Sequence, residues 1–157
     1  MVSDINQNIL STADKGISVR SLWKVFGKNP HELFNSPLRN MEKSTIQRDL
    51  NLVVALKDVS FEVTPGETFV VMGLSGSGKS TLVRCLINLI EPTSGSIIVD
   101  GQDITQFNQK ELRDFRRSKI AMVFQNFGLL PHKNVLDNAA YGLEVKGIEK
   151  HERYELA

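Results

Sequence analysis

The chain has 157 residues, and its 19 Lys and Arg against 18 Asp and Glu leave a net charge of +1 at pH 7. This balance gives no electrostatic basis for binding nucleic acid or an anionic membrane surface. Because 41% of the residues are hydrophobic and no apolar run approaches the ~20 residues of a membrane span, the composition is that of one soluble domain without a transmembrane segment.

The first third of the chain is predicted to hold a tail, a strand and an insertion. Residues 1–16 are rich in Asn, Ser and Asp, lack the apolar core of a signal peptide, and are predicted to be a disordered tail. Residues 17–26 alternate loosely between apolar and polar side chains, which predicts a strand. Residues 28–51 break this pattern with two prolines and mixed charges, so we expect an insertion with one or two short helices and a capping box from Ser44 to Gln47.

A second β pattern follows the insertion. Residues 52–63 alternate again and predict a strand. Residues 64–67 have Pro at the second position and Gly at the third, which suits a type II turn. Residues 69–72 are a continuous apolar run, as expected of a buried parallel strand.

A glycine-rich loop follows this run and leads into a helix expected from Lys79 to about Ile90. It has the P-loop spacing of a glycine, four residues, and then Gly-Lys-Ser. Glycines let the loop wrap a triphosphate with backbone N–H groups, and the helix N-terminus adds a positive dipole end. A cation in the first helical turn is unfavourable unless an anion is bound. The predicted nucleotide-binding residues here are Gly73, Leu74, Ser75, Gly76, Ser77, Gly78, Lys79, Ser80 and Thr81.

Three P-loop side chains have distinct predicted roles. Lys79 reaches the β- and γ-phosphates, the Ser80 hydroxyl ligates Mg²⁺, and Thr81 adds a hydroxyl toward the α-phosphate. Cys85, the single cysteine, lies in the helix behind the loop and excludes an intrachain disulfide. A buried structural thiol explains it better than a reactive one.

The second half of the chain is predicted to begin with a hairpin over residues 96–104, with a primed turn at Asp100-Gly101. A helix capped by Asn108 and Glu111 comes next. Residues 120–124 then indicate another buried parallel strand.

The end of the chain is predicted to be a loop and two helices. Residues 125–133 form the loop, and a helix runs from Asn134 to about Val145. A further helix begins near Ile148, with Glu149 and Arg153 placed to pair, and it shows no stop signal before the chain ends.

Gln125 and Phe26 are further candidates for the site. The stretch from Ile120 through Gln125 resembles the Q-loop of ATP-binding cassette (ABC) ATPases, although a surface glutamine would also explain Gln125 by itself. An amide oxygen can ligate Mg²⁺ or orient water, and a loop can move it. Phe26 resembles the aromatic that stacks on adenine in these ATPases, with a core aromatic as the alternative and Trp23 as a weaker candidate. His132 lacks a partner cluster and is interpreted as a loop-packing residue.

Together these motifs resemble the N-terminal part of an ABC-transporter ATP-binding subunit, most closely of the glycine betaine/L-proline (quaternary amine) importers. The resemblance covers residues 19–147. It implies an α/β P-loop NTPase fold, the ABC ATPase nucleotide-binding domain over residues 17–157. That domain is incomplete here, with an antiparallel β subdomain, part of the parallel core sheet and the start of the helical subdomain. The segments that carry the closer match are residues 22–27, the insertion before Val54, 72–81, 89–95, 120–124 and 135–138.

The resemblance also implies function and partners. The family couples MgATP binding and hydrolysis to uptake of glycine betaine or proline-type osmolytes, with Lys79 and Gln125 as catalytic residues and Ser80 and Gln125 on Mg²⁺. The implied partners are a transmembrane permease, contacted between Phe127 and His132, a second ATPase subunit in a dimer, and indirectly a periplasmic or lipid-anchored binding protein. The implied location is peripheral, on the cytoplasmic face of the membrane.

Nothing in the 157 residues resembles the LSGGQ signature, the second acidic motif (Walker B) with its catalytic glutamate, or the switch histidine of that family. We therefore expect the isolated chain to bind nucleotide weakly at best and not to hydrolyse it. The alternative function is a truncated interaction or regulatory fragment that docks on the transporter without hydrolysing ATP. A small kinase or GTPase is a third class, but the guanine-reading Asn-Lys-x-Asp motif is missing.

Overall fold

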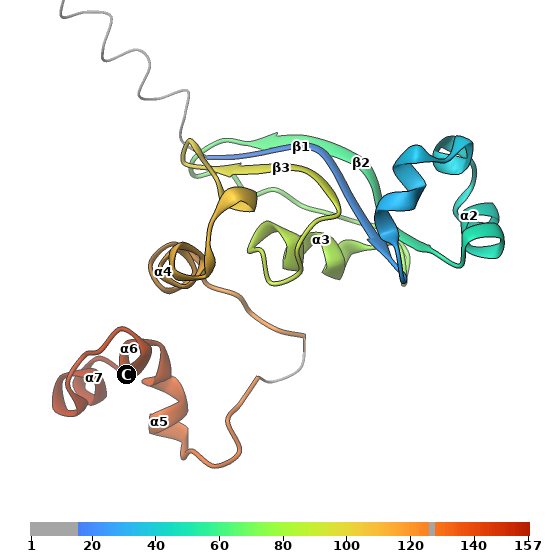
Figure 1. The fold of residues 1–157 in the computed structure, drawn as a ribbon. Helices are drawn as coiled ribbons and strands as arrows, with labels where there is room; N and C mark the ends of the chain where they lie inside the picture. The colour runs from blue at the N-terminus through green and yellow to red at the C-terminus, as the bar shows by residue number, and fades with distance from the viewer. Residues whose placement is uncertain (1–15, 126–127) are drawn as a thin grey trace, which may run out of the picture. The chain divides into compact units, whose positions relative to one another are not determined.

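The computed structural model describes residues 16–125 and 128–157, and it divides the chain into two compact units, residues 1–108 and 109–157 (Figure 1). The predicted disordered tail lies outside the described residues except for Gly16. Over the described ranges, no helix combines the length and the apolar character that crossing a membrane requires.

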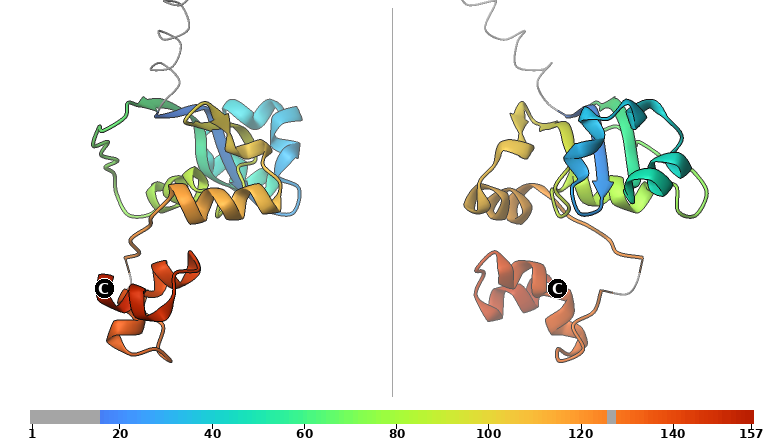
Figure 2. Two further views of the ribbon diagram at one scale, coloured as in Figure 1. Left: turned by 90° about the vertical axis from the view of Figure 1, so that its left-hand side faces the viewer. Right: turned by 45° about the vertical axis from the view of Figure 1, so that its right-hand side comes forward.

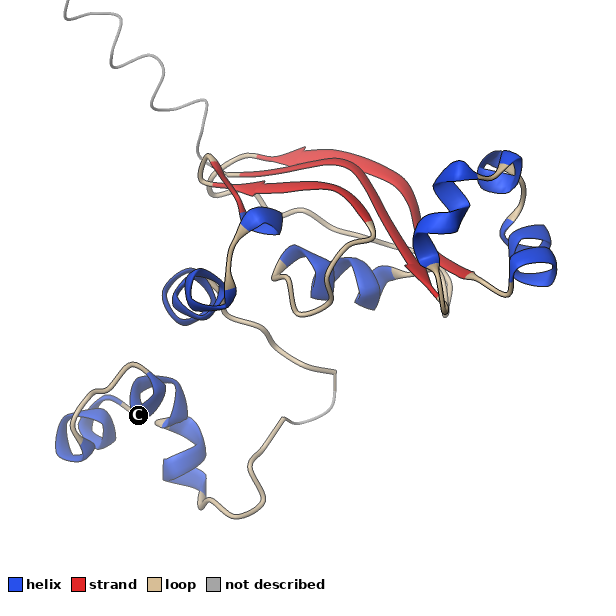
Figure 3. Ribbon diagram, in the orientation of Figure 1, coloured by secondary structure: helices blue, strands red, loops and turns tan. Residues whose placement is uncertain are grey.

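The first unit is built on an antiparallel sheet with the strand order β2-β1-β3-β4 (Figure 3). Strand β1 has the predicted bounds, and β2 begins one residue later than predicted. The alternating pattern therefore identified both strands correctly. The four strands are β1 (Ile17–Phe26), β2 (Val53–Val63), β3 (Ser94–Val99) and β4 (Gln102–Asp103).

An irregularity in the sheet explains why the alternation along the strands is loose. Ser21 in β1 and Asp58 in β2 have positive φ angles of 43° and 50°, and the β1–β2 register shifts between Val19 and Leu22. The Ser21 N–H donates to the Ser60 hydroxyl at 2.8 Å. The bulge breaks the strict alternation, because Leu22 and Trp23 are buried in succession between the buried residues Val19 and Val25.

The turns that join these strands have the predicted types. Gly66 has φ +78°, and the Glu67 N–H donates to the Thr64 carbonyl at 3.1 Å, as a type II turn requires. Asp100 and Gly101 have φ angles of 49° and 79° between β3 and β4, as expected of a primed turn. Both predictions are confirmed because turn type depends on local backbone conformation.

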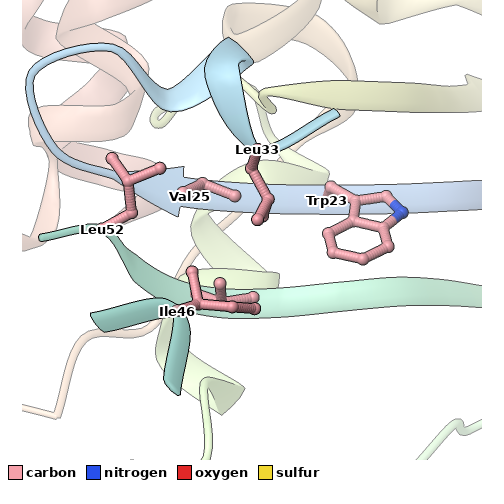
Figure 4. Close-up of a cluster of buried hydrophobic side chains, with 6 residues drawn as sticks. Trp23, Val25, Leu33, Ile46 and Leu52 are labelled. Atoms are coloured by element: carbon pink, nitrogen blue, oxygen red, sulfur yellow. The ribbon is translucent and has the colours of Figure 1, made fainter. Parts of the chain in front are cut away.

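The insertion forms three helical segments rather than one or two: η1 (Pro30–Asn35), η2 (Pro37–Asn40) and α2 (Lys43–Leu50). They bring apolar side chains against β1 and β2 in one buried cluster (Figure 4). The Trp23 and Phe34 rings meet edge to face at 5.5 Å within it. The buried members of this cluster are Trp23, Val25, Leu33, Ile46, Leu52 and Val54.

The predicted capping box of the insertion is wrong. Helix α2 begins at Lys43, its N-cap is Glu42, and no side chain caps it. Ser44 therefore lies inside the first turn. The Ile46 N–H donates to the Glu42 carbonyl at 3.1 Å, and Ile46 is fully buried. Packing of Ile46, rather than a local cap, sets where the helix starts.

Residues 69–72 do not form the predicted buried strand. They have no strand assignment, and their four side chains are 39–87% exposed. A parallel strand is stabilised by hydrogen bonds to its neighbours and by cover on both faces. No described strand pairs with this segment, although the Phe69 ring stacks on Phe61 at 4.7 Å.

Helix α3 (Lys79–Leu86) follows the glycine-rich loop and covers one face of the sheet (Figure 2). It buries Leu82 and Cys85. The helix ends four residues before the predicted limit, because Asn88 adopts a positive φ of 48° and its N–H donates to the Cys85 carbonyl at 2.8 Å. The first unit ends with β4 and the short η3 (Ile104–Gln106).

The second unit contains α4 (Gln109–Lys119), α5 (Val135–Ala139), α6 (Tyr141–Val145) and α7 (Lys150–Leu156). Helix α4 begins directly after Asn108, as expected, and buries Leu112 and Phe115. Residues 120–124 are a second predicted buried strand that does not form, and Val123 is 97% exposed. The reason is the same: no described strand pairs with this segment.

The predicted helix from Asn134 is divided in two at Ala140, which ends α5 and precedes α6. The helix starts at Asn134 as expected, and the Asn134 side chain caps α5 by accepting from the Asp137 N–H at 2.8 Å. The predicted pair of Glu149 and Arg153 is wrong, because Arg153 lies 3.5 Å from the Glu144 carboxylate instead. Lys133 also binds Glu144 at 2.8 Å, and this hydrogen bond lowers the pKa of Glu144.

Candidate nucleotide-binding site

The glycine-rich loop is held against strand β2 at its last glycine. Gly78 has φ +100° and directly precedes α3. A Cβ at this position would lie 2.6 Å from the Ala55 carbonyl oxygen and 3.3 Å from the Leu56 side chain. The glycine is therefore needed for two reasons, a left-handed backbone and a close approach of the loop to β2.

Lys79 folds back into this loop. Its ammonium donates to the carbonyl oxygens of Gly73 and Leu74, at 2.7 Å each, and lies 3.5 Å from the Ser77 hydroxyl. The positive charge is thus held by the carbonyl oxygens at the start of the loop. An ammonium with hydrogen bonds only to neutral groups can exchange them for stronger, charge-assisted bonds to phosphate.

The first turn of α3 offers further groups to an anion. It contains no acidic residue, Ser80 is exposed, and Thr81 is half-buried. The unpaired N–H groups and the dipole of a helix N-terminus favour negative charge at this point. A hydroxyl such as that of Ser80 is a hard oxygen donor, which suits Mg²⁺ bound together with phosphate oxygens.

Phe26 lies at the same end of the β1–β2 pair as the loop. It is 40% exposed and pairs with Val53 on β2, two residues before Ala55, whose carbonyl faces Gly78. Two residues of a strand span ~7 Å. The residue of β2 that pairs with Phe26 therefore lies only that far along the strand from the residue that contacts the loop. Trp23, the weaker candidate for stacking, is only 3% exposed and lies in the apolar cluster of the insertion.

Cys85 is buried behind the P-loop, as expected. The thiol is fully inaccessible, and burial raises its pKa from an ordinary value of 9.0 to about 11. The neutral thiol is neither a good nucleophile nor a metal ligand at neutral pH.

We expect the Cys85 thiol to react slowly with a thiol-specific reagent at pH 8 in the native chain and rapidly in denaturant. A pKa raised from 9.0 to about 11 alone reduces the thiolate fraction about a hundredfold. Because the folded-state pKa is the higher one, the stabilisation from burying the neutral Cys85 thiol is fully present below pH 9 and is lost as the pH rises through about 11. Because the chain has one cysteine, the rate reports this site alone. A native rate equal to the denatured rate would contradict the burial.

Gln125 belongs to the second unit, and it is exposed. The predicted Q-loop, residues 125–133, and the predicted permease contact, between Phe127 and His132, lie partly outside the described residues, because positions 126 and 127 are not described. Gln125 and the P-loop therefore belong to different units, and the role of Gln125 in the site stays a prediction. His132 is exposed, and the described residues hold no group of three His, Cys, Asp or Glu placed to bind a metal.

One asparagine organises the described part of that loop. The Asn138 side chain accepts from the Leu130 N–H at 2.7 Å and donates to the carbonyl oxygens of Leu130 and Lys133 at 3.2 and 2.9 Å. These bonds hold the loop beside α5 around a largely apolar pocket. Asn138 lies in a segment of the family resemblance, but its role in holding the loop was not predicted, because the bonds cross five to eight residues of irregular chain. The pocket is lined by Leu129, Leu130, Pro131, Lys133, Val135, Asn138 and Ala139.

Known proteins that resemble this chain share one family description. The profile of a family described as "ABC transporter" matches residues 56–157. The glycine betaine/proline betaine transport system ATP-binding protein ProV of Salmonella typhimurium is 49% identical over 141 aligned residues. The alignment covers 90% of this chain and 35% of ProV. The glycine betaine transport ATP-binding protein OpuAA of Bacillus subtilis is 47% identical over 141 residues, 34% of its length. The chain therefore spans about a third of the length of these curated relatives.

Solved structures agree at the level of the fold. A dimeric structure of MJ0796, a bacterial ABC transporter cassette, matches with a TM-score of 0.70 at 29% identity, covering 88% of this chain and 53% of that chain. A dimeric post-hydrolysis structure of the same cassette, bound to ADP and Pi, matches with a TM-score of 0.69 at 28% identity over the same shares. The fold expected from the motifs, an α/β P-loop nucleotide-binding domain present in part, is confirmed.

Proposed function

Because the chain belongs to the ABC transporter family and is related to ATP-binding proteins of glycine betaine and proline betaine transport, we propose that it serves in the ATP-binding subunit of an importer of such osmolytes. In this role the subunit binds MgATP, and hydrolysis of the nucleotide drives uptake. The osmolyte class rests on the 47–49% identity to these relatives, since the substrate itself contacts other subunits.

The observation that carries the nucleotide site is the loop geometry in front of α3. Gly78 closes the loop against β2, and the Lys79 ammonium lies among the loop's carbonyl oxygens. The N-terminus of α3 is left without an acidic side chain. A loop of this shape supports binding of a phosphate chain rather than a purely structural turn.

Each site residue then has a chemical task. Lys79 leaves the carbonyls of Gly73 and Leu74 and binds the β- and γ-phosphates, where it stabilises the charge that develops during transfer. Ser80 holds Mg²⁺, which supplies Lewis-acid stabilisation of the phosphate oxygens when it is bound. Phe26 provides a face for the adenine, and Gln125 positions the metal or the attacking water.

The partners proposed for the subunit follow from the same role. The loop that contains Leu130 and Pro131, held by Asn138 beside an apolar pocket, is the contact surface for a transmembrane permease. A second ATPase subunit completes a dimer, as in the dimeric cassette MJ0796. The binding protein for the osmolyte acts through the permease, and the subunit lies on the cytoplasmic face of the membrane.

One observation favours the alternative, a piece that docks on the transporter without hydrolysing ATP. The apolar side chains of residues 69–72 remain exposed, which is a surface that favours association. In this alternative the loop beside α5 contacts the transporter, and the P-loop takes no part in ATP hydrolysis.

The test is ATP hydrolysis by the chain alone and by a version continued through the signature and the second acidic motif. We expect no turnover by the 157-residue chain and vanadate-sensitive turnover by the longer version, because the catalytic glutamate of the family belongs to the motif that the chain lacks. Osmolyte uptake by cells that produce the longer version with its permease identifies the substrate. A longer version that binds ATP but never hydrolyses it, and leaves uptake unchanged, would favour the docking alternative.

A further inference from the structure

We propose that Lys43, in the insertion between β1 and β2, is a second cation of the nucleotide site and contacts the phosphate chain. This inference rests on the proposed function, since it extends the same site. No motif includes Lys43, and its part in the site becomes visible only in the folded chain.

The geometry centres on one carbonyl oxygen. The Lys43 ammonium donates to the Ala55 carbonyl at 3.3 Å, and a Cβ on Gly78 would lie 2.6 Å from the same oxygen. Lys43 and the last glycine of the P-loop therefore approach one atom of β2. The separation between the ammonium and that Cβ position cannot exceed the sum of these two short distances. An exposed lysine side chain can cover that separation by a change of rotamer.

The electrostatics also favour an anion here. Lys43 is the first residue of α2, and neither α2 nor α3 has an acidic residue in its first turn. A cation at a helix N-terminus is unfavourable unless an anion is close. Lys79 has the same position in α3, so each helix begins with a lysine, and Lys43 and the residue before Lys79, Gly78, both approach the Ala55 carbonyl oxygen. The nearest acidic group along the chain, Glu42, accepts from the Ser44 hydroxyl at 3.5 Å.

The ammonium of Lys43 has no carboxylate partner among the residues that the structure describes, and it donates a hydrogen bond to a neutral carbonyl oxygen. It is exposed, so the side chain is available to a ligand. A phosphate offers stronger, charge-assisted hydrogen bonds than a carbonyl. The insertion thereby contributes directly to nucleotide binding, in addition to packing against β1 and β2.

Lys57 provides a matched control. Its ammonium donates to the Met41 carbonyl at 2.9 Å, so it also links β2 to the insertion through one lysine and one backbone oxygen. The direction is reversed, however: Lys57 reaches from the strand toward the insertion, while Lys43 reaches from the insertion toward the strand and the P-loop. A role in anchoring the insertion predicts equal effects for both lysines, and a role in binding phosphate predicts an effect for Lys43 alone.

The experiment is a titration of a fluorescent ATP analogue with Mg²⁺ against the chain and its Lys43→Ala, Lys43→Gln, Lys57→Ala and Lys79→Ala variants, with circular dichroism to verify folding. We expect both Lys43 variants to bind about three- to tenfold more weakly, as suits a charge-assisted contact at a partly exposed site. Lys57→Ala should bind like the parent. In competition with the analogue, the affinity for ADP should fall by the same factor in the Lys43 variants, and the affinity for adenosine should not change.

The outcomes separate the two proposals. Parent-like binding by both Lys43 variants, or equal weakening by Lys43→Ala and Lys57→Ala, overturns the role of Lys43 while leaving the P-loop site intact. Equal weakening of ADP and adenosine does the same, because a phosphate contact cannot affect adenosine. If the parent does not bind the analogue, or if Lys79→Ala binds as well as the parent, the nucleotide site itself is wrong and the proposed function fails with it.

Discussion

We expect Lys79→Ala to weaken Mg²⁺-dependent binding of ATP about a hundredfold or more, because charge-assisted hydrogen bonds to an ionised group are worth ~1.5–3 kcal/mol each and the lysine reaches two phosphates. In the free chain the ammonium binds only the carbonyls of Gly73 and Leu74. These bonds are exposed, so their loss should change the thermal midpoint little. The measurement is a titration with a fluorescent ATP analogue, with and without Mg²⁺.

Two comparisons make this result specific to the P-loop. Lys79→Arg keeps the charge but replaces a compact ammonium with a planar fork, so its affinity should lie between those of the parent and Lys79→Ala. Lys57→Ala removes a lysine that binds the insertion and should leave the affinity unchanged. If Lys79→Ala retained the parent's affinity in a folded chain, the loop would be a structural turn and not a phosphate site.

Gly78→Ala should strongly destabilise the first unit. An alanine at φ +100° costs ~1–2 kcal/mol in backbone conformation, and its Cβ would lie 2.6 Å from the Ala55 carbonyl oxygen. Neither the loop nor β2 can shift without disturbing the packing of α3. The combined loss should be about 2–5 kcal/mol of unfolding free energy, measured by chemical denaturation, and nucleotide binding should be lost with it.

Gly66→Ala is the matched control for that substitution. Gly66 also has a positive φ, +78°, but nothing lies within 4 Å of where its Cβ would be. It should therefore cost only the conformational part, ~1–2 kcal/mol, and leave nucleotide binding intact. Equal losses for the two alanine variants would show that the contact between Gly78 and β2 contributes nothing to stability.

The elements predicted correctly from the sequence are those that local chemistry determines. The strand over residues 17–26 was found from its alternation, and the turns at residues 64–67 and at Asp100-Gly101 from their Pro and Gly positions. Asn134 was identified correctly as the start of a helix because its side chain caps its own first turn. The turns and the cap are fixed by hydrogen bonds within a few residues along the chain, whereas the strand was recognised from its residue pattern although its partners β2 and β3 are distant in sequence.

The predictions that were wrong depended on distant partners. Residues 69–72 and 120–124 have the apolar composition of buried parallel strands, yet they stay unpaired and exposed. An apolar composition indicates that a segment could be buried as a strand, but the strand forms only where neighbouring strands are present to pair with it. The start of α2 was also missed, because burial of Ile46 against the sheet outweighed the local cap at Ser44.

By itself, the sequence predicted the chemistry of the site: the spacing from Gly73 to Thr81 predicts a phosphate-binding loop, because those residue types are needed wherever a backbone wraps a phosphate chain, and the predicted helix behind the loop is confirmed. Only the tertiary structure decided what surrounds that loop. It placed Phe26 two residues of β2 away from the contact with Gly78 and brought Lys43 from the insertion to the Ala55 carbonyl. Contacts between residues so far apart in the chain depend on sheet register and helix packing, which local spacing does not encode.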